Sequence, residues 1–190
     1  MSRRRWWALL LCIVAVGLTI RIGYAVGWRQ EREVLRGDAV YYHVGANLLA
    51  RGEGFPQPIA YAFTFHREPG AEHPPGYIVY LAIASKFGFR TVADHQVWSA
   101  LLGAASVLLI GIVARRLFGP KLALLAAALA AISPNIWMPD AWVMSETLAI
   151  FATVLVLYFS YRCWDDPRPM TALALGVAVG IAAMSRSELI

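Results

Sequence analysis

The chain has 190 residues, of which 59% are hydrophobic and 15% charged, and its mean hydropathy is +0.56. This composition excludes an ordinary soluble domain. The net charge of +5 comes from basic residues clustered beside apolar segments, so it reflects membrane topology and does not indicate nucleic-acid binding. Cys12 and Cys163 lie in or beside apolar segments and predict neither a disulfide nor a metal site.

Hydrophobic segments long enough to cross a bilayer, which takes about 20 residues, follow one another along the chain. The first is Trp6–Trp28, interrupted only by Arg21. Four more follow residue 95: Gln96–Phe118, Lys121–Met138, Ala141–Tyr161 and Thr171 to the end. The shorter run Tyr77–Phe89 better suits a helix at the interface. We therefore predict an all-α polytopic membrane protein with about five transmembrane helices.

Basic residues predict how these segments are oriented. They occur before the first span, between the second and third, and between the fourth and fifth: Arg3, Arg4, Arg5; Arg115, Arg116, Lys121; Arg162, Arg168. With alternating crossings these three stretches lie on one side, which the positive-inside rule makes cytoplasmic. Residues 29–95 then form one large external loop. We predict a multi-pass protein of the cell membrane with a cytoplasmic N-terminus and an external active face.

The external loop begins with a predicted short helix, Ala39–Arg51. Asp38 is its predicted N-cap, and Gly52 or Gly54 its stop. The apolar residues of this helix would let it lie on the membrane surface. Asp38 has two interpretations, a helix cap alone or a functional carboxylate close to the first span.

The second half of the loop is rich in aromatic residues and histidine. Phe55–Gly70 either lines a groove for sugar or lipid or anchors at the headgroups. The run Glu72–Tyr77 contains two prolines and a glycine, which would hold His73 in a set direction. All four histidines fall in residues 29–95. With Asp38 and Glu72 they could ligate a divalent cation, but no spacing is that of a recognised metal motif, so the metal stays unknown.

Six ionisable residues lie at, or within a turn or two of, the same end of different segments: Asp38, His73, Asp140, Glu146, Arg186 and Glu188. Such groups at a membrane face are costly unless they have a function. Asp140 follows Pro139, where an acid in the first turn of a helix would complement the helix dipole. Glu146 lies about one and a half turns into the fourth predicted span. An Arg–Glu pair involving Arg186 has two interpretations, packing or a phosphate clamp.

Two patterns of small residues predict close helix packing. One is the alanine-rich run Leu122–Ala131, and the other is Gly176-x-x-x-Gly180. Small side chains let helix backbones approach each other in a membrane. Neither pattern carries chemistry.

Short motifs in a fixed order run through the whole chain. They are Leu18–Arg21, Gly37–His43, Ala46–Phe55, His73–Tyr77, Ala114–Gly119, Ser133–Asn135, Ser145–Leu148 and Ser185–Glu188. Their order and topology resemble the N-terminal part of the polyprenyl-phosphate-dependent membrane glycosyltransferases with the GT-C fold. This group includes protein O-mannosyltransferases, the lipid A aminoarabinose transferase and related bacterial enzymes.

The resemblance implies a function. Such enzymes move a sugar from a polyprenyl-phosphate donor to an external acceptor, which is a lipid, a glycan or a protein. It implies that Asp38 is the general base, and that Asp140 and Glu146 position the donor or a metal. Arg186 would bind the donor phosphate, and we assign His73 and Glu188 to the same donor site. Protein O-mannosyltransferases usually have Asp-Glu where this chain has Asp38-Ala39, which favours the broader bacterial branch.

The resembling enzymes are longer than 190 residues, so we expect a single unit that is an incomplete part of a GT-C module and is inactive alone. It comprises the first span (1–28), the external loop (29–95) and the remaining spans (96–190). Two other functions stay open. One is a non-catalytic scaffold or degenerate relative. The other is a transporter subunit, which would place polar residues near the middle of the membrane, where these spans are almost wholly apolar.

Overall fold

The computed structural model describes residues 1–29 and 35–189 and is all-α, as predicted. Within those residues the only β pairing is an isolated bridge between Pro56 and Pro69. Three helices are long and apolar enough to cross a membrane: Arg3–Gly27, Val92–Ile132 and Glu146–Asp165. The helix Pro169–Ser185 is apolar but shorter.

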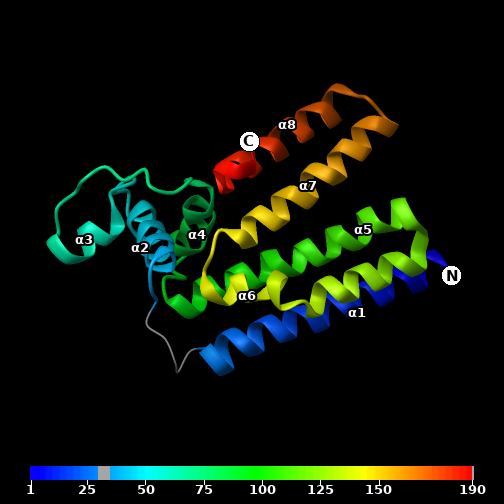
Figure 1. Cartoon of the computed structure of the whole chain (residues 1–190), viewed down its shortest axis with the longest axis horizontal. Helices are drawn as coiled ribbons and strands as arrows, with labels where there is room; N and C mark the ends of the chain where they lie inside the picture. The colour runs from blue at the N-terminus through cyan, green and yellow to red at the C-terminus, as the bar shows by residue number, and fades with distance from the viewer. Residues whose placement is uncertain (30–34, 190) are drawn as a thin grey trace.

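The bundle consists of α1 (Arg3–Ile22), α5 (Val92–Ile132), α7 (Glu146–Asp165) and α8 (Pro169–Ser185). A π-helical segment, η1 (Gly23–Arg29), continues α1. Helix α5 consists of two helices joined at Gly119, which has a φ of +79° and is followed by Pro120. The chain reverses there, and the second arm of α5 returns beside α1 (Figure 1). One element therefore supplies both the second and the third predicted spans.

The two ends of the bundle differ in what they carry (Figure 1). The N-terminus, the Gly119 turn and the turn between α7 and α8 lie at one end, which we call the basic end because it carries the three basic stretches. The helices α2 (Asp38–Ala50), α3 (Pro58–Thr64) and α4 (Gly76–Lys86) lie at the other end, which we call the loop end. The final segment η2 (Ser187–Leu189) also lies there.

Small residues let α1 approach both arms of α5. Trp6 and Leu10 pack among Val107, Ala123 and Ala127 in one buried cluster. A β-carbon added at Gly111 would lie 2.6 Å from a methyl carbon of Leu10, so the contact depends on glycine. The alanine-rich run thus packs closely, as its composition predicts.

The other small-residue pattern behaves differently. A β-carbon at Gly176 or Gly180 would meet nothing within 4 Å among the described residues. The prediction that this pair packs against a neighbouring helix is therefore wrong for the described part of the chain.

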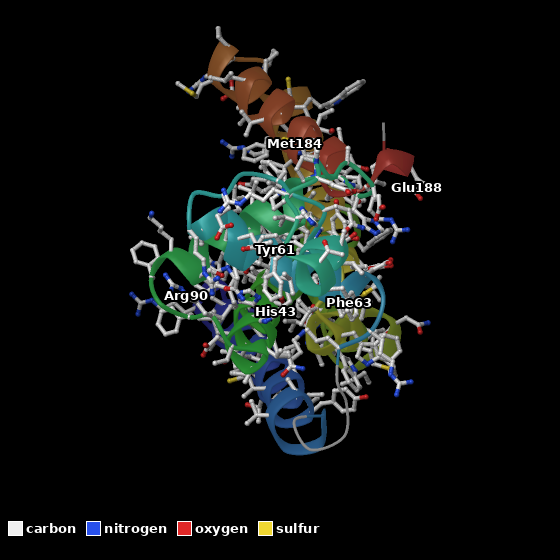
Figure 2. All side chains as sticks on the ribbon, turned by 90° about the vertical axis from the view of Figure 1, so that its left-hand side faces the viewer. His43, Tyr61, Phe63, Arg90, Met184 and Glu188 are labelled. Atoms are coloured by element: carbon white, nitrogen blue, oxygen red, sulfur yellow. The ribbon has the colours of Figure 1, made fainter. Side chains whose placement is uncertain are left out.

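The loop end is anchored to the bundle by an aromatic cluster and a buried polar chain. Tyr42 and Tyr77 pack with Leu81, Val143 and Leu148. Figure 2 looks onto the loop end and shows His43 among the side chains of that end.

The polar chain joins α2, α5 and α4. The Nδ1 atoms of His43 and His95 are 3.0 Å apart, and Nε2 of His95 lies 2.9 Å from the Ser85 hydroxyl. Burial lowers the pKa of His43, which favours the neutral ring that such a nitrogen-to-nitrogen hydrogen bond requires.

Two predicted helix starts differ in the structure. Gly37, not Asp38, caps α2: its φ is +57° and its carbonyl accepts from the Val40 N–H. Asp38 is the first helical residue, and the helix ends before Gly52, as predicted. The predicted span Ala141–Tyr161 begins instead at Glu146, which opens α7.

The fourth span begins later than predicted because Ser133 and Pro134 start a separate helix, α6 (Pro134–Trp142). Its last turn contains Asp140, and Val143 then turns the chain with a φ of 56°. An acid near the C-terminal end of a helix does not complement the helix dipole. The dipole interpretation of Asp140 is therefore wrong.

Candidate functional site at the loop end

A cleft of about 270 Å³ opens between α2, the turn before α4, and the ends of α7 and α8 that lie at the loop end. Five of the six predicted site residues line it: Asp38, His73, Glu146, Arg186 and Glu188. They come from segments far apart in the sequence, so the bundle topology brings them together. Their roles stay predictions.

Asp38 and His73 form the side of the cleft that belongs to the loop. Nε2 of His73 lies 3.5 Å from Oδ1 of Asp38, and the Asp38 side chain is 52% exposed. The His73 ring packs against Tyr41 and Tyr42, with ring centroids 4.6 and 5.3 Å away. These contacts fix the direction of His73, as the prolines beside it predict.

Arg186 and Glu146 form the side of the cleft that belongs to the bundle. Nη1 of Arg186 donates to Oε1 of Glu146 at 2.6 Å, and Nε donates to Oε2 of Glu188 at 3.3 Å. The hydrogen bond to Glu188, and then that to Glu146, raise the pKa of Arg186. The Arg186 and Glu146 side chains are only 36% and 37% exposed, so this is a half-buried ion pair at the cleft wall.

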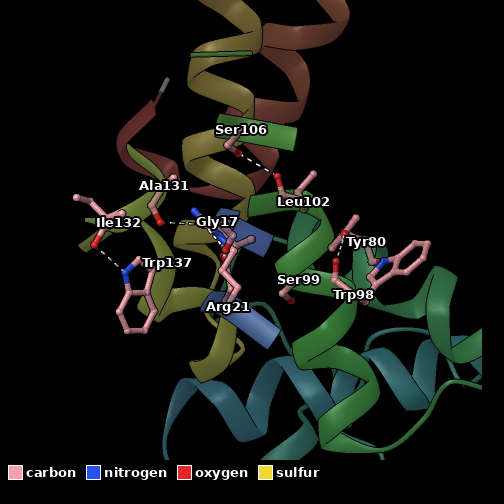
Figure 3. Close-up of polar contacts among 12 residues, drawn as sticks. Gly17, Arg21, Tyr80, Trp98, Ser99, Leu102, Ser106, Ala131, Ile132 and Trp137 are labelled. Atoms are coloured by element: carbon pink, nitrogen blue, oxygen red, sulfur yellow. Dashed lines mark hydrogen bonds and ion pairs between the residues drawn. The ribbon is translucent and has the colours of Figure 1, made fainter. Parts of the chain in front are cut away.

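Asp140 does not line the cleft; its side chain is only 1% exposed and pairs with Arg21. Nε of Arg21 donates to Oδ2 of Asp140 at 2.8 Å, and Nη1 donates to the carbonyls of Gly17 and Ala131. Figure 3 shows Arg21 between these two residues. The prediction that Asp140 joins the other five in one site is therefore wrong in its geometry.

Sequence reasoning did not select Tyr42 and Ser145, which also line the cleft. Glu72, which the sequence suggested only as a possible metal ligand, lines it too. Burial raises the pKa of Tyr42, and a hydrogen bond with Ser145 opposes that effect. The spacing could have found Tyr42, because it lies four residues after Asp38 and therefore on the same face of α2.

Two larger hollows adjoin the cleft. One, of about 820 Å³, shares Glu72, His73 and Pro74 with it and is otherwise lined mainly by apolar and aromatic residues. The other, of about 390 Å³, is an apolar groove between α4, α5, α7 and α8. Val79 and Met184 line both hollows, and Met184 lies two residues before Arg186.

The four histidines do not converge. His43 pairs with His95, His73 faces Asp38, and His66 is exposed in the loop. Among the described residues, no group of three or more His, Cys, Asp or Glu side chains could hold a metal ion. A cation shared between protein and substrate stays a prediction.

Together, the apolar bundle and the charged cleft at its end define a polytopic membrane protein with a polar site at one membrane face. Residues 72–190 match the family model of dolichyl-phosphate-mannose-protein mannosyltransferases. That is more than half of the chain, and the chain belongs to this family of GT-C membrane glycosyltransferases. No curated protein and no solved structure matched it. The matched segment includes His73, Glu146, Arg186 and Glu188, whereas Asp38 lies before it.

The two sides of the cleft meet where Gly76 touches Met184. A β-carbon at Gly76 would lie 2.5 Å from the Met184 carbonyl oxygen. We expect Gly76→Ala to push α4 away from α8, and so to lower the midpoint of thermal unfolding in detergent. Gly180→Ala is the matched control, because its β-carbon meets nothing within 4 Å and alanine favours a helix by about 1 kcal/mol. Equal midpoints for the two variants would contradict this contact.

Proposed function

We propose that this protein transfers a sugar from a polyprenyl-phosphate donor to a hydroxyl group of an acceptor at the external membrane face. The observation that carries the proposal is the convergence of Asp38, His73 and Arg186 on one cleft beside an apolar groove. Family membership supports membrane glycosyl transfer in general. The specific donor, the acceptor and the base are our inference.

The apolar groove suits the lipid part of the donor. Leu148, Ile181 and Met184 line it together with residues of α4 and α5. Within the bilayer the polyprenyl chain is already in an apolar medium, so the groove would hold it by van der Waals packing. With the chain in this groove, the phosphate would lie near Arg186, where the guanidinium can bind it through charge-assisted hydrogen bonds.

The reaction then needs two groups from the cleft. The acceptor oxygen attacks the anomeric carbon, while the bond from that carbon to the phosphate oxygen breaks. The carboxylate of Asp38 takes the proton of the acceptor hydroxyl, and polyprenyl phosphate leaves with the bonding electron pair. Arg186 stabilises the negative charge on the departing phosphate. His73, 3.5 Å from Asp38, would orient that carboxylate.

The charge balance of the cleft supports adding a divalent cation. Among the described residues, Asp38, Glu72, Glu146 and Glu188 line it, against one guanidinium, that of Arg186. Oε2 of Glu146 is buried and has no hydrogen-bond partner among the described residues. Mg²⁺ is commonly held by one or two carboxylates together with substrate phosphate. A cation bound in that way would supply positive charge beside the phosphate; Glu146 is the carboxylate we assign to it.

Topology and sequence bear on which membrane face the site occupies and which class of acceptor it uses. All three basic stretches lie at the basic end, which under the positive-inside rule supports an external loop end in a cell membrane. The Asp38-Ala39 pair departs from the acidic pair usual in protein O-mannosyltransferases. We therefore propose a lipid or glycan acceptor ahead of a protein.

The first test removes the base. We expect Asp38→Asn to lower kcat by about 10²- to 10⁴-fold, because the amide cannot accept the proton, and to leave the KM for the donor nearly unchanged. Transfer of radiolabelled mannose from polyprenyl phosphate is measured in membranes that contain the full chain. Glu68→Gln, an exposed acid elsewhere in the loop, is the control. Undiminished transfer by Asp38→Asn would favour the non-catalytic scaffold.

The second test removes the phosphate contact. We expect Arg186→Gln to raise the donor KM about 10- to 100-fold, as the loss of a hydrogen bond to a charged group predicts. Arg186→Lys keeps the charge but loses the planar fork, so it should recover only part of the affinity. Lys86→Gln, an exposed cation at the same end, should behave as wild type. An unchanged donor KM in Arg186→Gln would place the phosphate elsewhere.

The third test concerns the cation. We expect transfer to fall on treatment with EDTA and to return when Mg²⁺ or Mn²⁺ is added, because the carboxylates of the cleft outnumber its guanidinium. The initial transfer rate is followed during a titration of each metal. Full activity after chelation would leave Arg186 as the source of positive charge.

A further inference from the structure

The buried pair of Arg21 and Asp140 lies outside the cleft, but a short chain of contacts connects it to the cleft. Arg21 belongs to α1, Asp140 to α6, and Thr147 to α7. Oδ2 of Asp140 accepts from Arg21, and its other oxygen, Oδ1, accepts from the Thr147 hydroxyl at 2.8 Å. Both carboxylate oxygens of Asp140 therefore accept a hydrogen bond, one from α1 and one from α7.

The start of α7 depends on this second bond. Ser145 is the N-cap of α7, but its side chain makes no capping hydrogen bond. The first turn therefore lacks the side-chain cap that usually stabilises a helix start. Thr147, buried at 2% exposure, supplies a different anchor through Asp140. The Tyr77 hydroxyl, which bonds to Ser99 at 2.7 Å, also makes a hydrogen bond with Thr147.

The same turn carries the carboxylate that holds the cationic group of the cleft. Glu146 precedes Thr147 directly, and its Oε1 accepts from Arg186 at 2.6 Å. A shift of the first turn of α7 would therefore move Glu146 and release Arg186. Gly103 leaves the space that the Arg21–Asp140 pair occupies. A β-carbon at Gly103 would collide with the Asp140 carboxylate and lie 2.8 Å from Nε of Arg21.

We propose that Asp140 is a positioning residue, which Arg21 holds in place and which acts through Thr147 to fix the first turn of α7. Glu146, and through it Arg186, are thereby placed in the cleft. The structural part of this inference stands on contacts alone. Its kinetic part rests on the proposed function, because it concerns the binding of the donor phosphate.

The experiment targets Thr147, because Thr147→Val removes the hydroxyl at nearly constant shape and leaves the ion pair intact. Amide hydrogen exchange of the full chain in detergent is followed by mass spectrometry. We expect peptides covering residues 144–149 to exchange about two- to tenfold faster in Thr147→Val, as the loss of one hydrogen bond predicts. Thr147→Ser keeps the hydroxyl and should exchange as wild type. Unchanged exchange in Thr147→Val overturns the inference, whatever the enzyme does.

A double-mutant cycle then tests the link to the cleft. Thr147→Val should raise the donor KM in the wild-type background but have little further effect in Glu146→Gln, because the link it disturbs is already broken. Equal effects in both backgrounds would mean that Thr147 does not act through Glu146, which overturns the proposed route. If the wild-type protein transfers no sugar, the proposed function fails, and the exchange measurement still decides whether the Thr147 hydroxyl, which donates to Asp140, fixes the first turn of α7.

Discussion

The ion pair between Arg21 and Asp140 is the contact on which the arrangement of the site depends. The side chains of these two residues are 0% and 1% exposed, and taking each charge out of water costs several kcal/mol. The pair makes further hydrogen bonds with Gly17, Ala131 and Thr147, whereas Nη2 of Arg21 is buried and has no hydrogen-bond partner among the described residues. Removing one partner of a buried pair typically costs about 3–5 kcal/mol, a large share of the stability of a domain. The pair therefore fixes α1, α6 and α7 relative to one another.

From this fixed point the site is built in two halves. The bundle supplies Glu146 and Arg186, whose places follow from the first turn of α7 and the last of α8. The loop end supplies Asp38 and His73, whose places follow from the aromatic cluster around Tyr42 and Tyr77. Because the halves touch where Gly76 meets the backbone of Met184, the width of the cleft depends on a contact that leaves no room for a side chain.

Much of this could be predicted from the sequence, because hydropathy and charge act over whole segments. Spans of about 20 residues place their ends at the two membrane faces, and so the gathering of Asp38, His73, Glu146, Arg186 and Glu188 at one end follows from alternation alone. Signals from neighbouring residues predicted the ends of individual helices less well. Gly37 adopts a left-handed conformation and caps α2 in place of Asp38; glycine is the residue that adopts it at no steric cost.

The burial of Asp140 could not be predicted, because its partner lies 119 residues earlier and neither residue shows by its neighbours that it pairs. A local signal did exist for α6. Proline at the first helical position after serine is a common helix start, and Ser133-Pro134 has that form. This signal would have ended the third predicted span at Ile132.

Under the proposed function, the charges around Arg186 would let one guanidinium keep its ion pair and also bind a donor phosphate. Guanidinium has five N–H donors, and the hydrogen bonds to Glu146 and Glu188 use only Nη1 and Nε. The two carboxylates are not equivalent. Glu146 is half-buried and 2.6 Å away, whereas Glu188 is largely exposed and 3.3 Å away. An arriving phosphate would therefore compete first with Glu188, since an exposed ion pair contributes little, while Glu146 keeps the guanidinium in place. The ion pair that connects α7 to α8 can thus persist while a phosphate binds to the remaining donors.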